Sequence, residues 1–139
     1  MFEIITNLWL GSKKDIKNTK LLLDKNIRLI VNLSSSEISK DNQFKYISVK
    51  KQSNIDINEW LFNCFKKIYQ YIDNFLESFN GIIFFCDDYT KSSTIISCYL
   101  MLKCKLKSDK IVKLLQSKNN TINYIKYISC LKKLEKIIS

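Results

Sequence analysis

An uninterrupted apolar run at residues 82–86, IIFFC, constrains the fold more than any other feature of the sequence. Five residues are far too few to cross a bilayer, and consecutive apolar side chains are typical of a strand that is covered on both faces of its sheet. Similar runs at 28–33 and 46–49, with shorter ones at 4–5 and 8–10, predict further strands. The sequence therefore predicts an α/β fold with a mostly parallel central sheet flanked by helices.

Apolar residues at helical spacing predict the helices. Ser12 and Asp56, each followed three residues later by a carboxylate, predict helix starts, and the second of these helices is long and ends near Gly81. No linker or repeat breaks the 139 residues, so a single domain spanning 1–139 is expected. Six polar residues follow the run at 82–86, and the predicted helices cover 13–24, 56–80, 95–102, 108–115 and 125–138.

Five cysteines and the complete absence of histidine limit the chemistry that the chain can support. The cysteines are odd in number and none forms a C-x-x-C pair, which argues against a zinc site or a disulfide framework. The first residues lack the basic patch and apolar run of a secretory signal, so we expect a soluble protein of the reducing cytoplasm, without metal, cofactor or membrane contact. Four of the cysteines fall in predicted helices and are interpreted as small core residues: Cys64, Cys98, Cys104 and Cys130.

The net charge of +10 is spread over the sequence, with a surplus of five basic residues in each half. Lysine supplies every basic residue except Arg28, and lysine lacks the planar fork with which arginine grips phosphates and guanines. The many isoleucines, asparagines and lysines, with no alanine or proline, suit the coding bias of an A/T-rich genome. Two interpretations stay open: solvated lysine faces, or a functional surface for a polyanion.

Residues 85–94, FCDDYTKSST, combine a strand that ends in cysteine with a polar loop and a helix. Such a loop points backbone N–H groups and the positive end of the helix at whatever lies above the cysteine. Its order and spacing resemble H-C-x-x-G-x-x-R-S, the signature of the dual-specificity protein phosphatases. The resemblance extends to residues 3–12, 30–34 and 99–101 and covers essentially the whole chain. It implies the dual-specificity phosphatase fold. The composition suits a compact family member from a large DNA virus or from an A/T-rich protist.

The resemblance implies that Cys86 stands at the nucleophile position and Ser93 at the position of the hydroxyl that assists departure of the thiolate. Three other signature positions differ. Phe85 replaces the histidine that favours the thiolate, Tyr89 replaces the loop glycine, and Ser92 replaces the arginine that holds two phosphate oxygens and the transition-state charge. Loss of the arginine is the decisive change, because the charge that develops during phosphoryl transfer is left without its main partner.

Charges around the loop and at the general-acid position also depart from the family pattern. Asp87 and Asp88 place two carboxylates at the lip of the phosphate cradle, where each would repel a phosphate. Lys91, one place before the arginine position, supplies a cation without the two-pronged geometry. The family's acidic aspartate aligns with Lys51 or Gln52, and neither protonates a leaving group well.

The sequence therefore predicts a pseudophosphatase, in which the fold is kept, catalysis is lost and the domain binds or regulates a protein partner. Asp56 would replace the missing acid only if its loop were realigned, and the N-cap of the following helix is its favoured interpretation. Two alternatives stay open: a weak cysteine-dependent phosphatase that uses Cys86 with Lys91, and a basic RNA-binding domain on the same fold. The predicted binding rim of the former active site comprises Lys50, Lys51, Gln52, Asp87, Asp88, Tyr89, Thr90 and Lys91.

Overall fold

The structure, a computed structural model, describes residues 1–51, 54–87, 89–118 and 125–138. The chain divides into two compact units, Met1–Lys50 with Gln70–Tyr89 and Lys51–Tyr69 with Thr90–Ser139. The first unit holds the strands, and the second holds most of the helical residues. None of the helices in these described ranges has the length and apolar character that a membrane crossing requires. A single domain over the whole chain stays a prediction.

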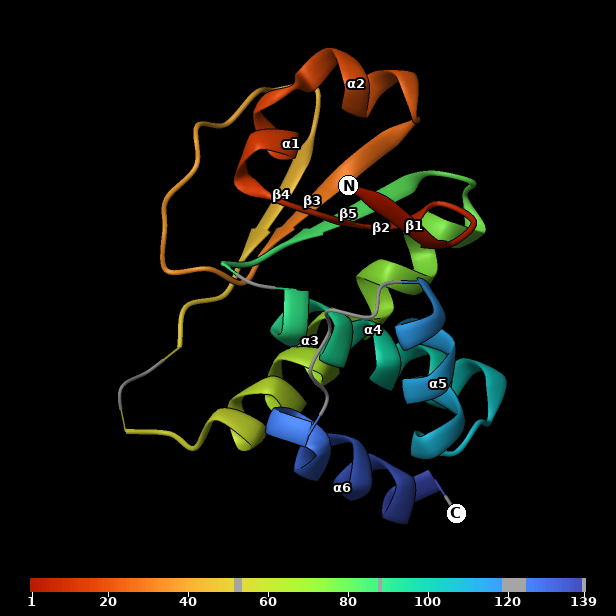
Figure 1. The fold of residues 1–139 in the computed structure, drawn as a ribbon. Coiled ribbons are helices and arrows are strands. Elements are labelled where there is room, and N and C mark those ends of the chain that lie inside the picture. The colour runs from red at the N-terminus through yellow and green to blue at the C-terminus, as the bar shows by residue number, and fades with distance from the viewer. Residues whose placement is uncertain (52–53, 88, 119–124, 139) are drawn as a thin grey trace. The chain divides into compact units, whose positions relative to one another are not determined.

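A five-stranded sheet forms the first unit, with the strand order β1-β2-β5-β3-β4 (Figure 1). β1 pairs antiparallel with β2, and the other three pairings are parallel. All five residues of β5 are buried, as their consecutive apolar side chains predict. The mostly parallel sheet and the α/β class are thus confirmed. The strands are β1 (Phe2–Ile5), β2 (Leu8–Gly11), β3 (Ile27–Asn32), β4 (Lys45–Ser48) and β5 (Gly81–Phe85).

Two short helices, α1 (Lys13–Lys17) and α2 (Thr19–Asp24), stand in place of the single helix predicted over 13–24. Asn18 ends α1 and is the N-cap of α2, because its side-chain oxygen accepts the backbone N–H of Leu21 at 3.2 Å. Asparagine competes for backbone groups in this way and so interrupts helices. The apolar pattern alone did not reveal the break, because both short helices keep their apolar side chains on the same face.

The predicted start of the first helix is confirmed, since Ser12 and Asp15 form a capping box. Burial of Asp15 opposes its ionisation, but hydrogen bonds from the backbone and side chain of Ser12 hold the pKa of Asp15 below its ordinary value. Helices α1 and α2 lie against one face of the sheet (Figure 1). Their shared core with the sheet comprises Ile16, Leu22, Ile27, Ile30, Phe44, Ile83 and Phe85.

Helix α3 (Ile57–Glu77) begins where the sequence predicts. A carboxylate oxygen of Asp56 accepts the backbone N–H groups of Asn58 at 3.0 Å and Glu59 at 3.2 Å. These donors belong to the first turn of the helix and have no partner within it. Asp56 is therefore the N-cap of α3, and the capping interpretation is confirmed.

The end of α3 differs from the prediction that was based on Gly81. Phe79 takes the left-handed conformation that ends the helix, with φ of 61°, and the N–H of Asn80 donates to the Phe75 carbonyl at 2.9 Å. Gly81 instead opens β5, where an added Cβ would lie 3.0 Å from the carbonyl oxygen of Asn26. Glycine is needed there for the close approach of two backbone segments, and an exposed phenylalanine carries the conformational strain of the helix end.

The second unit is dominated by α4 (Tyr89–Cys104), α5 (Ser108–Lys118) and α6 (Ile128–Ile138), with a 3-10 helix at Ile125–Tyr127. α4 begins earlier than the predicted 95–102, because hydroxyl side chains that look like a polar loop in the sequence bond to carbonyls of their own helix. All residues from 92 to 101 are buried.

Three of the four helical cysteines are buried as predicted. The Sγ atoms of Cys98 in α4 and Cys130 in α6 lie 3.8 Å apart, and the side-chain oxygen of Asn58 accepts the backbone N–H of Cys130 at 3.1 Å. Burial raises the pKa of the Cys64 thiol to about 12. Cys104 is exposed, so its assignment to the core is wrong: it lies in the last turn of α4, beyond the buried stretch of that helix.

Candidate functional site

Cys86 follows β5 at the carboxyl edge of the sheet in the first unit. The parallel neighbour β3 ends at the same edge, where the N–H of Leu33 donates to the carbonyl of Phe85 at 2.8 Å. The Cys86 side chain is buried, and its Sγ lies 3.8 Å from the Leu33 carbonyl oxygen. A protonated Cys86 thiol can donate to this carbonyl oxygen.

A network of short-range hydrogen bonds fixes the loop that carries the Leu33 carbonyl. The side-chain oxygen of Asn32 accepts the N–H and the O–H of Ser34, at 2.9 and 2.6 Å. The Asn32 side-chain N–H donates to the carbonyl of Ser36 at 2.8 Å. Sequence reasoning missed this network, although an asparagine that ends a strand two residues before a serine is a pattern in which side chains bind nearby backbone groups. The network holds the acceptor of the Cys86 thiol in place.

Two of the side chains that differ from the phosphatase signature, Phe85 and Tyr89, make packing contacts in the first unit. Phe85 is buried in the core that the sheet shares with α1 and α2. The ring of Tyr89 meets the ring of Phe2 edge-on, with centroids 5.1 Å apart and planes at 77°. Burial raises the pKa of Tyr89, and the charge of Asp15 raises it further. The Tyr89 side chain is therefore a neutral, half-buried ring at the predicted rim.

The first turns of α4, in the second unit, carry Ser92 and Ser93, which the resemblance aligns with the arginine and the assisting hydroxyl of the signature. The Thr90 carbonyl accepts the hydroxyls of Ser93 at 3.2 Å and Thr94 at 2.7 Å. The Ser93 hydroxyl thus donates into its own helix. Ser92 is fully buried, and its Oγ has no hydrogen-bond partner among the residues that the structure describes. An uncharged hydroxyl at this position cannot grip two phosphate oxygens as a guanidinium does.

Lys91 lies on the same turn and contacts an aromatic ring of the second unit. Its Nζ is 6.0 Å from the centroid of the Trp60 ring, and Trp60 is buried. An ammonium over an indole face is stabilised by the charge distribution of the ring. Turning Lys91 toward a phosphate, as the weak-phosphatase alternative requires, would give up this contact.

The residues predicted to stand at the acid position are lysine and glutamine in the sequence, and the structure describes only one of them. Lys50, the preceding residue, pairs with Glu37 at 3.3 Å on the exposed surface of the first unit, where ion pairs contribute little. Lys51 is exposed. Gln52 lies outside the described residues, as does Asp88 in the loop after Cys86.

The predicted site residues divide between the two units. Asp87 is exposed at the loop, and within the described ranges no cluster of three metal-ligating side chains occurs. All five cysteines are free thiols. The first unit contains Lys50, Cys86, Asp87 and Tyr89, and the second contains Lys51, Thr90, Lys91, Ser92 and Ser93.

Comparisons with known proteins agree with the α/β fold of the chain. Human DUSP28 matches 99% of the chain with a TM-score of 0.85 and 15% identity, over 97% of its own structure. The human tyrosine phosphatase-like serine/threonine/tyrosine-interacting protein matches 97% with a TM-score of 0.83 and 19% identity, over 95% of its structure. In sequence, dual specificity protein phosphatase 4 of Gallus gallus is 27% identical over 125 residues. The chain is thus similar to the dual-specificity protein phosphatases in fold and, over those 125 residues, in sequence.

The match to the chicken phosphatase covers 87% of this phosphatase-like chain but only 32% of the relative, so the chain spans about a third of that protein's length. No family model matches the chain. The structural matches, at identities below one fifth, establish the fold alone. The predicted resemblance and the predicted fold are confirmed.

Proposed function

We propose that the chain is a pseudophosphatase that acts as a protein-binding or regulatory module. The observation that carries the proposal is Ser92, a fully buried, uncharged side chain at the position where the phosphatase signature has arginine. Phosphoryl transfer depends almost entirely on positioning and on stabilising the charge of the transferred group. Without a guanidinium at this position, the charge of the transition state lacks its principal partner.

Two further contacts support the loss of catalysis. The Cys86 thiol donates toward the Leu33 carbonyl, an acceptor that would repel a thiolate. The ammonium of Lys91, the cation nearest in sequence to the missing arginine, lies over the Trp60 ring. Removing one preorganised charge donor lowers rates by about 10²–10³, and removing a general acid lowers them by about 10²–10⁴. Both losses together leave almost no turnover.

The binding role is proposed for the rim of the former active site, in a reducing, cytoplasmic setting. Within the first unit, the rim combines an aromatic ring, Tyr89, with the exposed carboxylate of Asp87 and the exposed ammonium group of Lys50. Lys51, in the second unit, is also exposed. Aromatic side chains amid charges of both signs are typical of protein-recognition surfaces. One of the structural relatives is itself described as a phosphatase-like interacting protein, which is consistent with such a role.

The decisive experiment measures hydrolysis of an aryl phosphate and of phosphopeptides by the wild type and by Cys86→Ser. We expect no turnover that depends on Cys86. The variant Ser92→Arg should not restore activity by itself, because the acid position and the carboxylates of the loop are separate defects. Cys86-dependent hydrolysis at ordinary phosphatase rates would refute the proposal and favour the weak-phosphatase alternative.

RNA binding is a second candidate function, and the charge of the C-terminal helices favours it. Residues 103–138 contain ten lysines and only two carboxylates. Affinity for RNA that falls steeply with salt would support a polyanion surface. Binding of a protein partner that persists at moderate salt and in Cys86→Ser would support the pseudophosphatase instead.

A further inference from the structure

Two cysteine side chains, Cys98 of α4 and Cys130 of α6, meet in the second unit. Their Sγ atoms lie 3.8 Å apart, and the two residues are 0% and 1% exposed. A disulfide bond is about 2.05 Å long, so the sulfurs would have to approach by about 1.8 Å. Rotation of the two side chains about their Cα–Cβ bonds moves the sulfur atoms by distances of this order. The thiols are therefore placed to form a bond with each other.

Hydrogen bonding and burial hold the backbone on both sides of this pair. The side-chain oxygen of Asn58, in the first turn of α3, accepts the backbone N–H of Cys130 at 3.1 Å. Cys98 lies in the stretch of α4 from 92 to 101, in which every residue is buried. A disulfide between positions that are already held in contact forms with little strain, and low strain makes such a bond stable.

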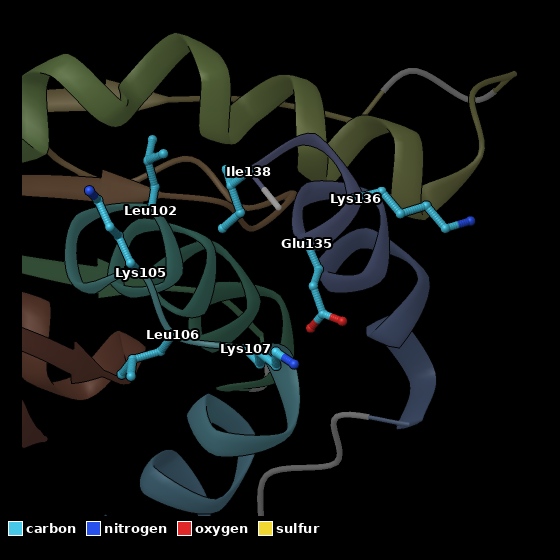
Figure 2. A pocket seen from close by; sticks show the side chains of 7 residues that line it. All are labelled: Leu102, Lys105, Leu106, Lys107, Glu135, Lys136 and Ile138. Carbon is cyan, nitrogen blue, oxygen red and sulfur yellow. The ribbon is translucent and has the colours of Figure 1, made fainter.

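The last turns of α4 and α6 are separated by a cavity of about 630 Å³, which Leu102 and Ile138 help to line (Figure 2). Glu135 of α6 accepts the backbone N–H of Ser108, the first residue of α5, at 2.7 Å. Figure 2 shows its carboxylate directed toward the turn between α4 and α5. The end of α6 is thus bonded to α5, and a covalent link at Cys130 would add a constraint between α6 and α4.

We propose that Cys98 and Cys130 are a reversible redox pair, which hydrogen peroxide oxidises to a disulfide between α4 and α6. One thiolate attacks the O–O bond of the peroxide, which leaves a sulfenic acid on that sulfur and releases hydroxide. The second sulfur then attacks the sulfenic sulfur, the S–S bond forms and water leaves. In sum, two thiols and one peroxide give one disulfide and two waters, and two electrons pass from the sulfurs to the peroxide oxygens.

Burial of the pair makes this oxidation slow. The thiolate is the reactive form, and the hydrogen bond with Cys130, together with burial, raises the pKa of Cys98. Oxidation therefore requires a local opening that exposes the pair, and exposed Cys104 should react sooner. Once formed, the disulfide restrains α6 until a thiol reductant reverses it by exchange. This redox function goes beyond the proposed protein-binding function and does not depend on whether the chain hydrolyses phosphate esters.

The test exposes the folded full chain, carrying Cys104→Ser, to hydrogen peroxide, blocks the remaining thiols with iodoacetamide and digests the unfolded product with trypsin. Cleavage after lysine places Cys98 in a peptide of residues 92–103 and Cys130 in a peptide of residues 127–132. We expect mass spectrometry to find these two peptides joined, and dithiothreitol to separate them. Peptides that stay separate after prolonged exposure, or that are joined to any other cysteine instead, would overturn the proposal.

Matched alanine variants show whether the disulfide restrains α6. Oxidation of the Cys104→Ser protein should raise its thermal midpoint by about 5 °C or more and slow amide hydrogen exchange in residues 128–138. Cys98→Ala in this background should abolish both effects. Cys64→Ala, which removes another buried cysteine of the second unit, should keep them. Oxidised protein with an unchanged midpoint and unchanged exchange, or an equal response in Cys98→Ala, would refute the redox pair.

Discussion

Two serines of α4 provide a matched test of the local chemistry at position 92, where the phosphatase signature has arginine. Ser92 and Ser97 are both fully buried in the same helix. The Ser97 hydroxyl donates to the Ser93 carbonyl at 2.6 Å, whereas the Ser92 hydroxyl has no partner within the described part of the chain. Replacing each serine by alanine removes the same atom, leaves a void of similar size and brings the same gain in helix propensity.

The expected change in the free energy of unfolding of each variant follows from the hydrogen bonding of the serine that is removed. A buried hydroxyl without a partner is unfavourable by about 1–3 kcal/mol, so Ser92→Ala should raise the free energy of unfolding by about 1 kcal/mol or more. A satisfied hydrogen bond contributes about 0.5–1.5 kcal/mol, so Ser97→Ala should lower the free energy of unfolding or leave it nearly unchanged. The propensity and void contributions cancel in the comparison, and the two variants should differ by about 2 kcal/mol.

Equilibrium unfolding in urea measures both variants against the wild type. With a slope near 2 kcal/mol per molar urea, the two transition midpoints should lie about 1 M apart, with Ser92→Ala the higher. Equal midpoints, or a Ser92→Ala midpoint below that of the wild type, would show that the Ser92 hydroxyl is satisfied. The argument that position 92 is a vacant polar site would then fail.

Three further predictions concern other parts of the chain. Phe79→Gly should raise the free energy of unfolding by about 1 kcal/mol, because glycine adopts the left-handed conformation of this 79% exposed residue without strain. Phe79→Ala should bring no such increase, and urea unfolding measures both variants. Ser12 lowers the pKa of Asp15 in the folded protein despite burial, so the Asp15 carboxylate should stabilise the fold above its ordinary pKa of 3.8. This stabilisation should be lost as pH falls through the lower pKa of the folded state. Asp15→Asn should therefore be destabilising at pH 7 and neutral near pH 2. Iodoacetamide should alkylate exposed Cys104 long before Cys64, whose pKa is raised to about 12 by burial, and equal rates by mass spectrometry would contradict this.

Local patterns predicted the starts of α1 and α3 and the buried strand well, because those features depend on side chains within a few residues. Ser12 and Asp56 cap helices as the sequence indicates, and β5 is buried throughout. The end of α3 could not be predicted in the same way. Gly81 looks like a helix terminator in the sequence, but the close approach of the backbone at Asn26 determines where glycine is needed. That contact joins residues far apart along the chain.

In the candidate site, too, the sequence predicted the order of the elements but not the contacts of individual side chains. The order of strand, cysteine and helix predicted the fold and the place of Cys86, but it could not show which acceptor the thiol meets. The polar stretch after Cys86 was expected to be a loop, whereas hydroxyls that bond to Thr90 within α4 allow the helix to begin at Tyr89 with its polar residues buried. Counting polar residues along a sequence does not reveal hydroxyls that are satisfied by their own helix.

The serine at position 92, where the phosphatase signature has arginine, also bears on whether the loop needs an anion. A guanidinium buried as Ser92 is would require an anionic partner, because an unpaired buried charge is strongly unfavourable. Serine removes that requirement, because an uncharged hydroxyl needs no counter-ion. The wild type should therefore have the same thermal unfolding midpoint in sulfate as in chloride of equal ionic strength. An anion that did bind the folded state, at 100 times its Kd, would raise the free energy of unfolding by about 2.7 kcal/mol. In Ser92→Arg, sulfate should raise the midpoint relative to chloride. Stabilisation of the wild type by sulfate to the same extent would show that an anion site persists without the arginine, and the case against catalysis would then lose its main support.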